Sequence, residues 1–296
     1  MPETRELLQP GSLWERLRSQ TSLAQETGAL KPIPTEFRVV GDGGVDFQVR
    51  VAPSLEEKIR ENREQRAREA AGQDADPFRP PEPDLFVGYL TPTHFGLLNK
   101  FPVLRHHLLL VTDDFEDQLA PLNPGDFEAL YLALTELDGL GFYNAGRIAG
   151  ASQPHKHLQL VPLPLDGTDR HLPIETLLHP EQLSDRPGHS PDLPFPHAAC
   201  RLDFAADGPG GLFERFRWLT REMGLEAEGA TYNLLVTREW MLLVPRTRER
   251  FEGVMINALG FAGGFLVRNE QDVDLLRRVG PMRVLQGVSG ALEGTN

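Results

Sequence analysis

The chain has 296 residues, of which 40% are hydrophobic, and a formal net charge of −13 at pH 7. This length allows one large α/β domain or two halves that share a core. The acidic balance excludes the basic footprint that duplex nucleic acid requires, so an anionic ligand must meet a local cluster of positive side chains. Only four of the 30 basic residues are lysines, namely Lys31, Lys58, Lys100 and Lys156.

The cysteine content and the N-terminal residues indicate the cellular compartment in which the protein works. The single cysteine, Cys200, excludes an internal disulfide and a cysteine-built metal site, which favours a reducing environment. The N-terminal residues contain no apolar signal core, and no stretch approaches 18 uncharged apolar residues. These features predict a cytoplasmic protein with no membrane partner and no nucleic-acid partner.

The N-terminal part predicts a helix, a hairpin and a second helix. Ser12 and Glu15 have the spacing of a capping box before an amphipathic helix. Residues 36–51 alternate apolar and polar side chains around a Gly-rich tip, which predicts a β-hairpin. A charged helix is expected over 54–72, and the Pro-rich segment 76–84 is expected to form a loop or a wrapped arm rather than a domain linker.

The middle of the chain predicts the main sheet. Apolar runs within 85–112 indicate two or three strands. Asn123, followed by a proline and by Asp126 in the capping-box position, predicts a well-capped helix. Residues 142–164 have the pattern of a strand, a small-residue turn and a second strand. Six prolines within 166–197 indicate an irregular excursion over the surface, either an ordered loop that faces a ligand or partner or a poorly ordered insertion.

The last hundred residues complete the predicted fold. They indicate a helix near 211–223, a hairpin over 232–246, a Gly/Ala-rich turn at 256–267 and a terminal amphipathic helix. The βαβ alternation of a doubly wound fold is missing. We therefore expect a single α+β domain over 1–296, with a mostly antiparallel sheet flanked by helices and the active-site strands near its centre.

The strand around residue 157 carries the polar residues with the clearest chemistry. Because strand side chains alternate between faces, His155, His157 and Gln159 are expected on one face, with Lys156 on the other. Two imidazoles on one face could chelate a metal with a third ligand from elsewhere. An imidazole is also a competent nucleophile, whose attack on phosphorus gives a phosphoramidate that a second nucleophile resolves.

A turn of small residues precedes this strand. Its backbone N–H groups can approach phosphate oxygens closely, and the Ser152 hydroxyl and Gln159 amide can add donors. The turn consists of Gly150, Ala151, Ser152 and Gln153. The nucleophile hypothesis therefore accounts for more of these residues than the metal-site hypothesis, and no set of residues demands a structural metal.

The stretch NAGRIAGASQPHKHLQ resembles the signature of the ATP adenylyltransferases, also called diadenosine tetraphosphate phosphorylases. These belong to the galactose-1-phosphate uridylyltransferase branch of the histidine-triad superfamily. The resemblance covers most of 45–270, including the segments 97–118, 139–146, 232–246 and 256–267. It implies a histidine-triad-like fold with a catalytic core over about 45–165 and a C-terminal part over about 198–296 that completes the pocket, with the Pro-rich loop 166–197 between them.

Carried over residue by residue, the resemblance implies roles for the strand residues. His157 would be the nucleophile that forms an adenylyl-histidine intermediate, and His155 its positioning neighbour. Gln159 stands where hydrolytic relatives have a third histidine. A neutral amide can hold phosphoryl oxygens but is a poor proton shuttle for water, so the intermediate can wait for phosphate.

The resemblance also implies substrate contacts. Asn99 matches a nucleoside contact. Asn144 and the turn 150–153 match phosphate and ribose contacts. Lys58 and Lys100 are expected to contact the polyphosphate as point charges. A second wall of the pocket is expected from Asn257, Ala258, Leu259, Gly264 and Arg268. Relatives usually have lysine where this chain has Arg268, which keeps a positive charge but alters the contact.

The implied reaction is a reversible phosphorolysis. His157 attacks the α-phosphorus of diadenosine tetraphosphate, ATP leaves, and inorganic phosphate then releases ADP. The expected partners are diadenosine tetraphosphate, ATP, ADP, AMP and phosphate. No cofactor is required, and Mg²⁺ is expected at most as a counter-ion of the polyphosphate. The alternatives are a transferase with another base or acceptor, such as a hexose-1-phosphate uridylyltransferase or an ADP sulfurylase, and a non-enzymatic nucleotide- or metal-binding protein.

Overall fold

An antiparallel sheet of eight strands forms the centre of the protein, for which the computed structural model describes residues 5–53, 76–165 and 172–290. The strands are β3 (Phe86–Thr91), β4 (His94–Leu98), β5 (Leu108–Thr112), β6 (Gly139–Asn144), β7 (His157–Pro162), β8 (Ala198–Arg201), β9 (Tyr232–Val236) and β10 (Trp240–Pro245). Their order across the sheet is β3-β4-β5-β7-β6-β9-β10-β8. The predicted α+β fold is confirmed, and the strand that carries His157 lies near the middle of the sheet.

A smaller, mixed sheet packs over one face of the eight-stranded sheet. It has the order β1-β2-β13 and consists of β1 (Glu36–Asp42), β2 (Val45–Val51) and β13 (Gly264–Val267). The hairpin of β1 and β2 is antiparallel, as the alternation of residues 36–51 predicts, whereas β13 pairs with β2 in parallel. The C-terminal part of the chain thus adds a strand to the N-terminal hairpin.

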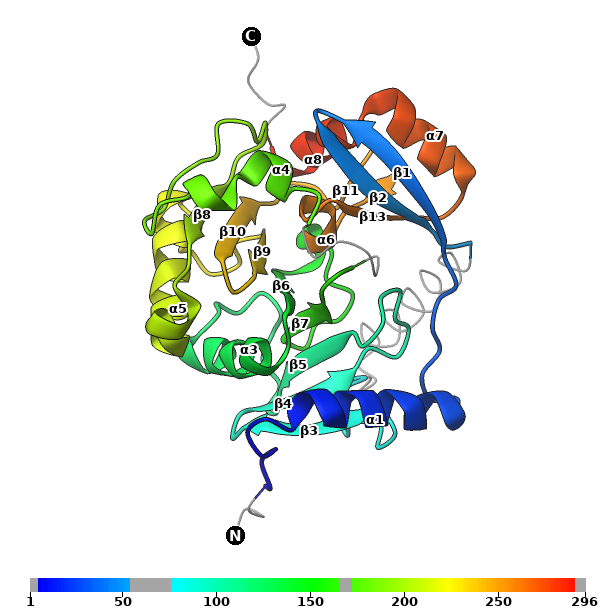
Figure 1. Ribbon diagram of the computed structural model, residues 1–296, viewed down its shortest axis with the longest axis vertical. Helices are drawn as coiled ribbons and strands as arrows, with labels where there is room; N and C mark the ends of the chain where they lie inside the picture. The colour runs from blue at the N-terminus through cyan, green and yellow to red at the C-terminus, as the bar shows by residue number, and fades with distance from the viewer. Residues whose placement is uncertain (1–4, 54–75, 166–171, 291–296) are drawn as a thin grey trace.

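Helices cover the outside of both sheets (Figure 1). One face of the large sheet packs against α1 (Leu13–Glu26), α3 (Pro124–Glu136) and α5 (Phe204–Glu222). The other face shares a core with the small sheet and with α6 (Ala258–Phe261), α7 (Glu270–Val279) and α8 (Pro281–Ser289). Shorter elements are η1 (Arg147–Ala149), β11 (Arg250–Phe251) and β12 (Val254–Met255). The described residues contain no helix that is long and apolar enough to cross a membrane.

Side-chain alternation assigns the residues of β7 to these two faces. Leu158 and Leu160 belong to the core beneath the three helices. Phe142, which is paired with Gln159 on the neighbouring strand, belongs to the core of the small sheet. Gln159 and His157 therefore point toward the small-sheet side, and Lys156 points toward α3.

The capping pattern at Asn123 is confirmed. The Asn123 side chain accepts from the backbone N–H of Gly125 and Asp126, and the Asp126 carboxylate accepts from the Asn123 N–H at 2.7 Å. The capping box expected at Ser12 does not form, because its hydroxyl donates to the Gln9 carbonyl instead. Glu136, distant in sequence, satisfies the start of α1 by accepting from the N–H groups of Gly11 and Leu13.

These two helix starts give a matched pair of substitutions. We expect Asn123→Ala to lower the free energy of unfolding by about 1 kcal/mol, because two helix N–H groups lose their acceptor. Ser12→Ala should cost less, since that side chain satisfies no N–H of α1. Urea denaturation followed by circular dichroism measures both, and equal losses would contradict the assignment.

The structure also revises several expected elements. The described part of the Pro-rich excursion is packed: it forms α4 (Glu175–Leu178) and η2 (Pro180–Gln182) and buries Ile174 and Phe195. The terminal helix is two helices, α7 and α8, separated at Gly280. The helix expected near 211–223 begins earlier, as part of α5, and the turn 256–267 holds α6 and β13. The helix expected over 54–72 lies outside the described residues.

Candidate active site

His157 is held in a single tautomer at the start of β7. Its side chain is 4% exposed, and its Nδ1 lies 2.8 Å from the carbonyl oxygen of His155. Because a carbonyl oxygen only accepts, the ring carries its proton on Nδ1 and leaves Nε2 unprotonated. Among the described residues Nε2 has no hydrogen-bond partner, and His157 lines a cavity. An imidazole held in this way is ready to act as a nucleophile.

Burial keeps this imidazole neutral. Desolvation lowers the pKa of His157 to about 4, outweighing the hydrogen bond to the His155 carbonyl, and the nearby His155 imidazole lowers it further. Between this pKa and the usual value of about 6.5, the His157 side chain binds a proton in the unfolded chain but not in the folded chain. The free energy of unfolding therefore falls as the pH drops from the usual value of about 6.5 toward about 4.

The backbone of His157 is fixed by Gln118, a residue that the sequence did not single out. Its Oε1 accepts from the His157 N–H at 2.9 Å, and its Nε2 donates to the carbonyl of Asn144 at 2.9 Å. Gln118 is 2% exposed. It joins β7 to the end of β6 where their direct pairing has ended, so His157 and Asn144 are held together.

His155 does not line either cavity, and its backbone carbonyl supports His157. Its Nδ1 lies 2.8 Å from Asp76 Oδ2, and its Nε2 lies 2.8 Å from the carbonyl oxygen of Thr112. Desolvation alone would raise the pKa of Asp76, but hydrogen bonds from His155 and from the Phe78 N–H hold it below its usual value. With both ring nitrogens engaged, His155 presents its carbonyl to His157 and is unsuited to bind a metal.

Gln159 is oriented by a chain of hydrogen bonds. The Asn99 Oδ1 accepts from the Phe101 N–H, which leaves its amide nitrogen to donate to His107 Nδ1 at 3.1 Å. His107 Nε2 then donates to Gln159 Oε1 at 3.0 Å. The amide NH₂ of Gln159 is thereby left as a donor toward the cavity. His107 was not anticipated, and its place in the turn between β4 and β5 gives no periodic signal.

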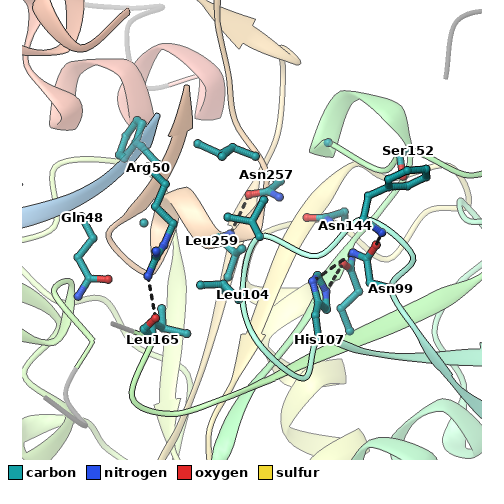
Figure 2. Close-up of a pocket in the computed structure, with 17 residues that line it drawn as sticks. Gln48, Arg50, Asn99, Leu104, His107, Asn144, Ser152, Leu165, Asn257 and Leu259 are labelled. Carbon is teal, nitrogen blue, oxygen red and sulfur yellow. Dashed lines mark hydrogen bonds between the residues drawn. The ribbon is translucent and has the colours of Figure 1, made fainter. Parts of the chain in front are cut away.

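Two cavities meet at this strand and share Asn99, Phe101, Ser152 and Gln159. The one lined by His157, here the histidine cavity, has a volume of about 460 Å³. It is also lined by Lys31, Pro77, Phe78, Glu82, Leu85, Leu97, Leu98, Lys100, Leu109, Gln153 and His157. The other, here the asparagine cavity (Figure 2), is also lined by Gln48, Arg50, Val103, Leu104, His107, Asn144, Gly150, Leu165, Asn257, Leu259, Gly264, Phe265 and Leu266.

The floor of the asparagine cavity is built by side-chain amides. Asn144 Oδ1 accepts from Asn233 Nδ2 at 2.8 Å and from the Ala258 N–H at 2.9 Å. Asn257 accepts from the Leu259 N–H at the start of α6. Gly150 has a φ of 97°, and a Cβ there would lie 2.7 Å from Asn257 Cβ. Only glycine therefore lets the predicted turn approach the second wall so closely.

Positive side chains from several segments line the two cavities. Lys100 lines the histidine cavity and is paired with Glu82 at 2.7 Å. Lys31, which was not proposed, lines the same cavity. Arg50 lines the asparagine cavity and donates to the carbonyl of Leu165. Lys58 lies outside the described residues.

Most of the expected contacts gather at these cavities. Asn99, Asn144, Gly150, Ser152, Gln153, Asn257, Leu259 and Gly264 line one or both of them. Ala151 and Ala258 are buried next to the lining residues, and Ala258 contributes its N–H to Asn144. Arg268 pairs with Asp272 and does not line either cavity, so its contact with polyphosphate remains a prediction.

The described residues hold no group of three His, Cys, Asp or Glu side chains arranged to bind a metal. The metal-site hypothesis for His155 and His157 therefore has no third ligand in that part of the chain. The arrangement instead offers a neutral imidazole nitrogen, an amide donor and lysines around one cavity. These groups suit attack on a phosphoryl group and stabilisation of its oxygens.

The antiparallel sheet, with His157 and Gln159 on its central strand β7 and His155 just before that strand, has the arrangement expected of the histidine-triad-like nucleotidyltransferases. Residues 3–180 match the Ap4A phosphorylase N-terminal domain, Ap4A being diadenosine tetraphosphate, and residues 191–291 match the ATP adenylyltransferase C-terminal domain. The chain belongs to the Ap4A phosphorylase family.

Relatives from Saccharomyces cerevisiae match over nearly the whole chain. Diadenosine 5',5'''-P1,P4-tetraphosphate phosphorylase 2 is 30% identical over 90% of each chain, and Protein APA1 is 29% identical over 88% of each. The crystal structure of yeast Ap4A phosphorylase Apa2 in complex with AMP aligns with a TM-score of 0.80 and 25% identity, covering 97% of both chains. The complex of Apa2 with Ap4A aligns with a TM-score of 0.76, covering 97% of this chain and 98% of that one.

Proposed function

We propose that this enzyme carries out reversible phosphorolysis of diadenosine tetraphosphate to ATP and ADP, through an adenylyl-histidine on His157. The observation that carries the proposal is the hydrogen bond from His157 Nδ1 to the His155 carbonyl, which leaves Nε2 unprotonated beside the amide of Gln159. Family membership and the yeast Apa2 complexes with Ap4A and AMP support the choice of substrate.

The first step joins His157 Nε2 to the α-phosphorus of the dinucleotide. The phosphorus–oxygen bond to the leaving group breaks, and ATP departs with that electron pair. Nδ1 keeps its proton, so the adenylylated ring is a cation that the His155 carbonyl stabilises at 2.8 Å. The amide NH₂ of Gln159 and the lysines of the histidine cavity face the phosphoryl oxygens, where charge develops.

The second step regenerates the histidine. An oxygen of inorganic phosphate attacks the same phosphorus, the phosphorus–nitrogen bond breaks, and its electron pair returns to His157 Nε2. ADP leaves, and the ring is again neutral with its proton on Nδ1. The protein needs no cofactor for either step, and we propose that Mg²⁺ enters only with the polyphosphate. We also propose that the enzyme works in the cytoplasm, since its single cysteine is a buried thiol.

Product analysis tests this function and its alternatives. The enzyme is incubated with diadenosine tetraphosphate and either phosphate, sulfate or water, and the nucleotides are separated by chromatography. We expect ATP and ADP only when phosphate is present. Adenosine phosphosulfate as the main product would favour an ADP-sulfurylase-like enzyme, and preferred turnover of a uridine nucleotide would favour a hexose-1-phosphate uridylyltransferase. No turnover with any acceptor would overturn the proposal.

The pH dependence of the first step follows from the burial of His157. We expect the single-turnover rate of ATP release to stay near its plateau from about pH 7.5 to about pH 5.5, because an ordinary histidine protonates near 6.5 and this one does not. The pKa of His157 lies at about 4. Rapid-quench measurements at saturating dinucleotide give the profile. A tenfold loss centred near pH 6.5 would contradict a neutral buried nucleophile.

A further inference from the structure

The Pro-rich segment after residue 75 inserts an aromatic ring into the active site. Phe78 is 6% exposed, and its ring centroid lies 5.2 Å from that of His157 and 5.7 Å from that of His155. The interplanar angle with His157 is 67°. Phe78 also lines the histidine cavity together with His157. An apolar ring thus lies against the imidazole that carries the proposed covalent intermediate.

The position of this ring is coupled to the catalytic strand through one carboxylate. Asp76 Oδ2 lies 2.8 Å from His155 Nδ1, while Asp76 Oδ1 accepts from the Phe78 N–H at 2.9 Å. The same carboxyl group therefore holds the supporting histidine and the backbone that carries the ring. The backbone of Phe78 is therefore held in a defined position relative to the histidines.

The one carboxylate among the described lining residues of the histidine cavity is already paired. The titratable lining residues of this cavity within the described chain are Lys31, Glu82, Lys100 and His157. Glu82, the carboxylate among them, is paired with Lys100 at 2.7 Å. The Oε1 atom of Gln159 accepts from His107. Among the described lining residues the one carboxylate is thus paired with a lysine, so we treat the access of water to the phosphorus as a control on hydrolysis.

We propose that Phe78 shields the adenylyl-histidine from water and so determines that the intermediate is resolved by phosphate. This inference rests on the proposed function. In the competing reaction a water oxygen attacks the phosphorus, the phosphorus–nitrogen bond breaks, and its electron pair returns to His157 Nε2. The water proton passes to solvent, and AMP is released in place of ADP. Phosphate carries its own negative charge to the lysines of the cavity, whereas neutral water gains nothing from them.

The test measures how the intermediate partitions. Phe78→Leu, Phe78→Val and Phe78→Ala are incubated with diadenosine tetraphosphate and phosphate in ¹⁸O-labelled water, and ADP and labelled AMP are quantified by mass spectrometry. We expect the ratio of AMP to ADP to rise as the side chain shrinks, by about tenfold for alanine, which corresponds to about 1.4 kcal/mol between the two barriers. The lifetime of the isolated adenylyl-enzyme without phosphate should shorten in the same order.

Phe115→Ala is the matched control. The Phe115 ring also lies 5.2 Å from His155, but its side chain is 55% exposed and does not line either cavity. This variant should keep the wild-type ratio and lifetime. If the alanine variant of Phe78 does not fold, the leucine and valine variants carry the comparison. An unchanged ratio and lifetime across the folded variants overturns the proposal, while absence of ADP from the wild-type enzyme overturns the proposed function instead.

Discussion

Replacing His157 by alanine is expected to lower phosphorolysis of diadenosine tetraphosphate by about 10⁴-fold or more, since a covalent route is lost with its nucleophile. The expectation rests on the free Nε2 atom and the fixed Nδ1 proton. His157 is the only histidine among the described lining residues of the histidine cavity. The loss should appear in kcat rather than in substrate affinity.

Trapping the intermediate checks this result directly. Enzyme is mixed with dinucleotide labelled on the α-phosphorus, quenched in base and analysed for protein-bound label, which is stable to alkali when carried by a histidine. The wild-type chain and His189→Ala should be labelled equally, because His189 is 56% exposed and is paired with Glu222. His157→Ala should carry no label. Label that persists in this variant would show that another residue is the nucleophile.

The second large effect is on stability and concerns Lys156. Its side chain is 0% exposed, and its ammonium contacts Glu116, the Pro121 carbonyl at 3.1 Å and Asp126 at 3.5 Å. Lys156→Met removes the charge but keeps most of the volume. Asp126 is itself 0% exposed and would lose its cationic neighbour. We expect the free energy of unfolding to fall by about 3 kcal/mol, because breaking a buried ion pair leaves an uncompensated charge.

An exposed ion pair provides the comparison for this substitution. Arg277 and Asp274 lie 3.0 Å apart on α7, with side chains 50% and 70% exposed. Arg277→Met should cost about 0.5 kcal/mol or less, as surface pairs usually do. Urea titrations of both variants at neutral pH give the two values. A loss for Lys156→Met that matches the loss for Arg277→Met would mean that Asp126 is satisfied by its other donors, His94 and the Asn123 N–H.

Local patterns predicted the parts of the site that lie on regular structure. Period-two alternation placed His157 and Gln159 on one face and Lys156 on the other, because a central strand must keep its register to bury both faces. The small-residue turn was also predictable from its composition. The structure gives the reason for a glycine there, because the close approach at Gly150 admits no Cβ. The capping box at Asn123 formed because its two partners are three residues apart.

Residues that reach the site from irregular or distant segments could not be predicted. Asp76 and Phe78 lie in a Pro-rich stretch whose composition indicates a loop but gives no direction for its side chains. Lys31 enters through a backbone contact of its N–H with the Lys100 carbonyl. The capping box predicted at Ser12 is absent for a similar reason, because Glu136 on another helix supplies the acceptor for the N–H groups at the start of α1. Tertiary packing decides such contacts, and no local period encodes them.

The two segments that match the family domains, residues 3–180 and 191–291, meet along a seam formed by paired strands. This seam determines what would happen if the chain were cut between them. β6 from the first segment pairs with β9 from the second, and the pairing of Asn144 with Asn233 puts the cavity floor on that seam. A fragment ending between the segments would expose the long edge of β6, and its counterpart would expose β9, which are open templates for aggregation. Neither fragment would contain the complete amide floor. Each matched segment therefore depends on the other for the pairing of its edge strand and for a complete cavity floor.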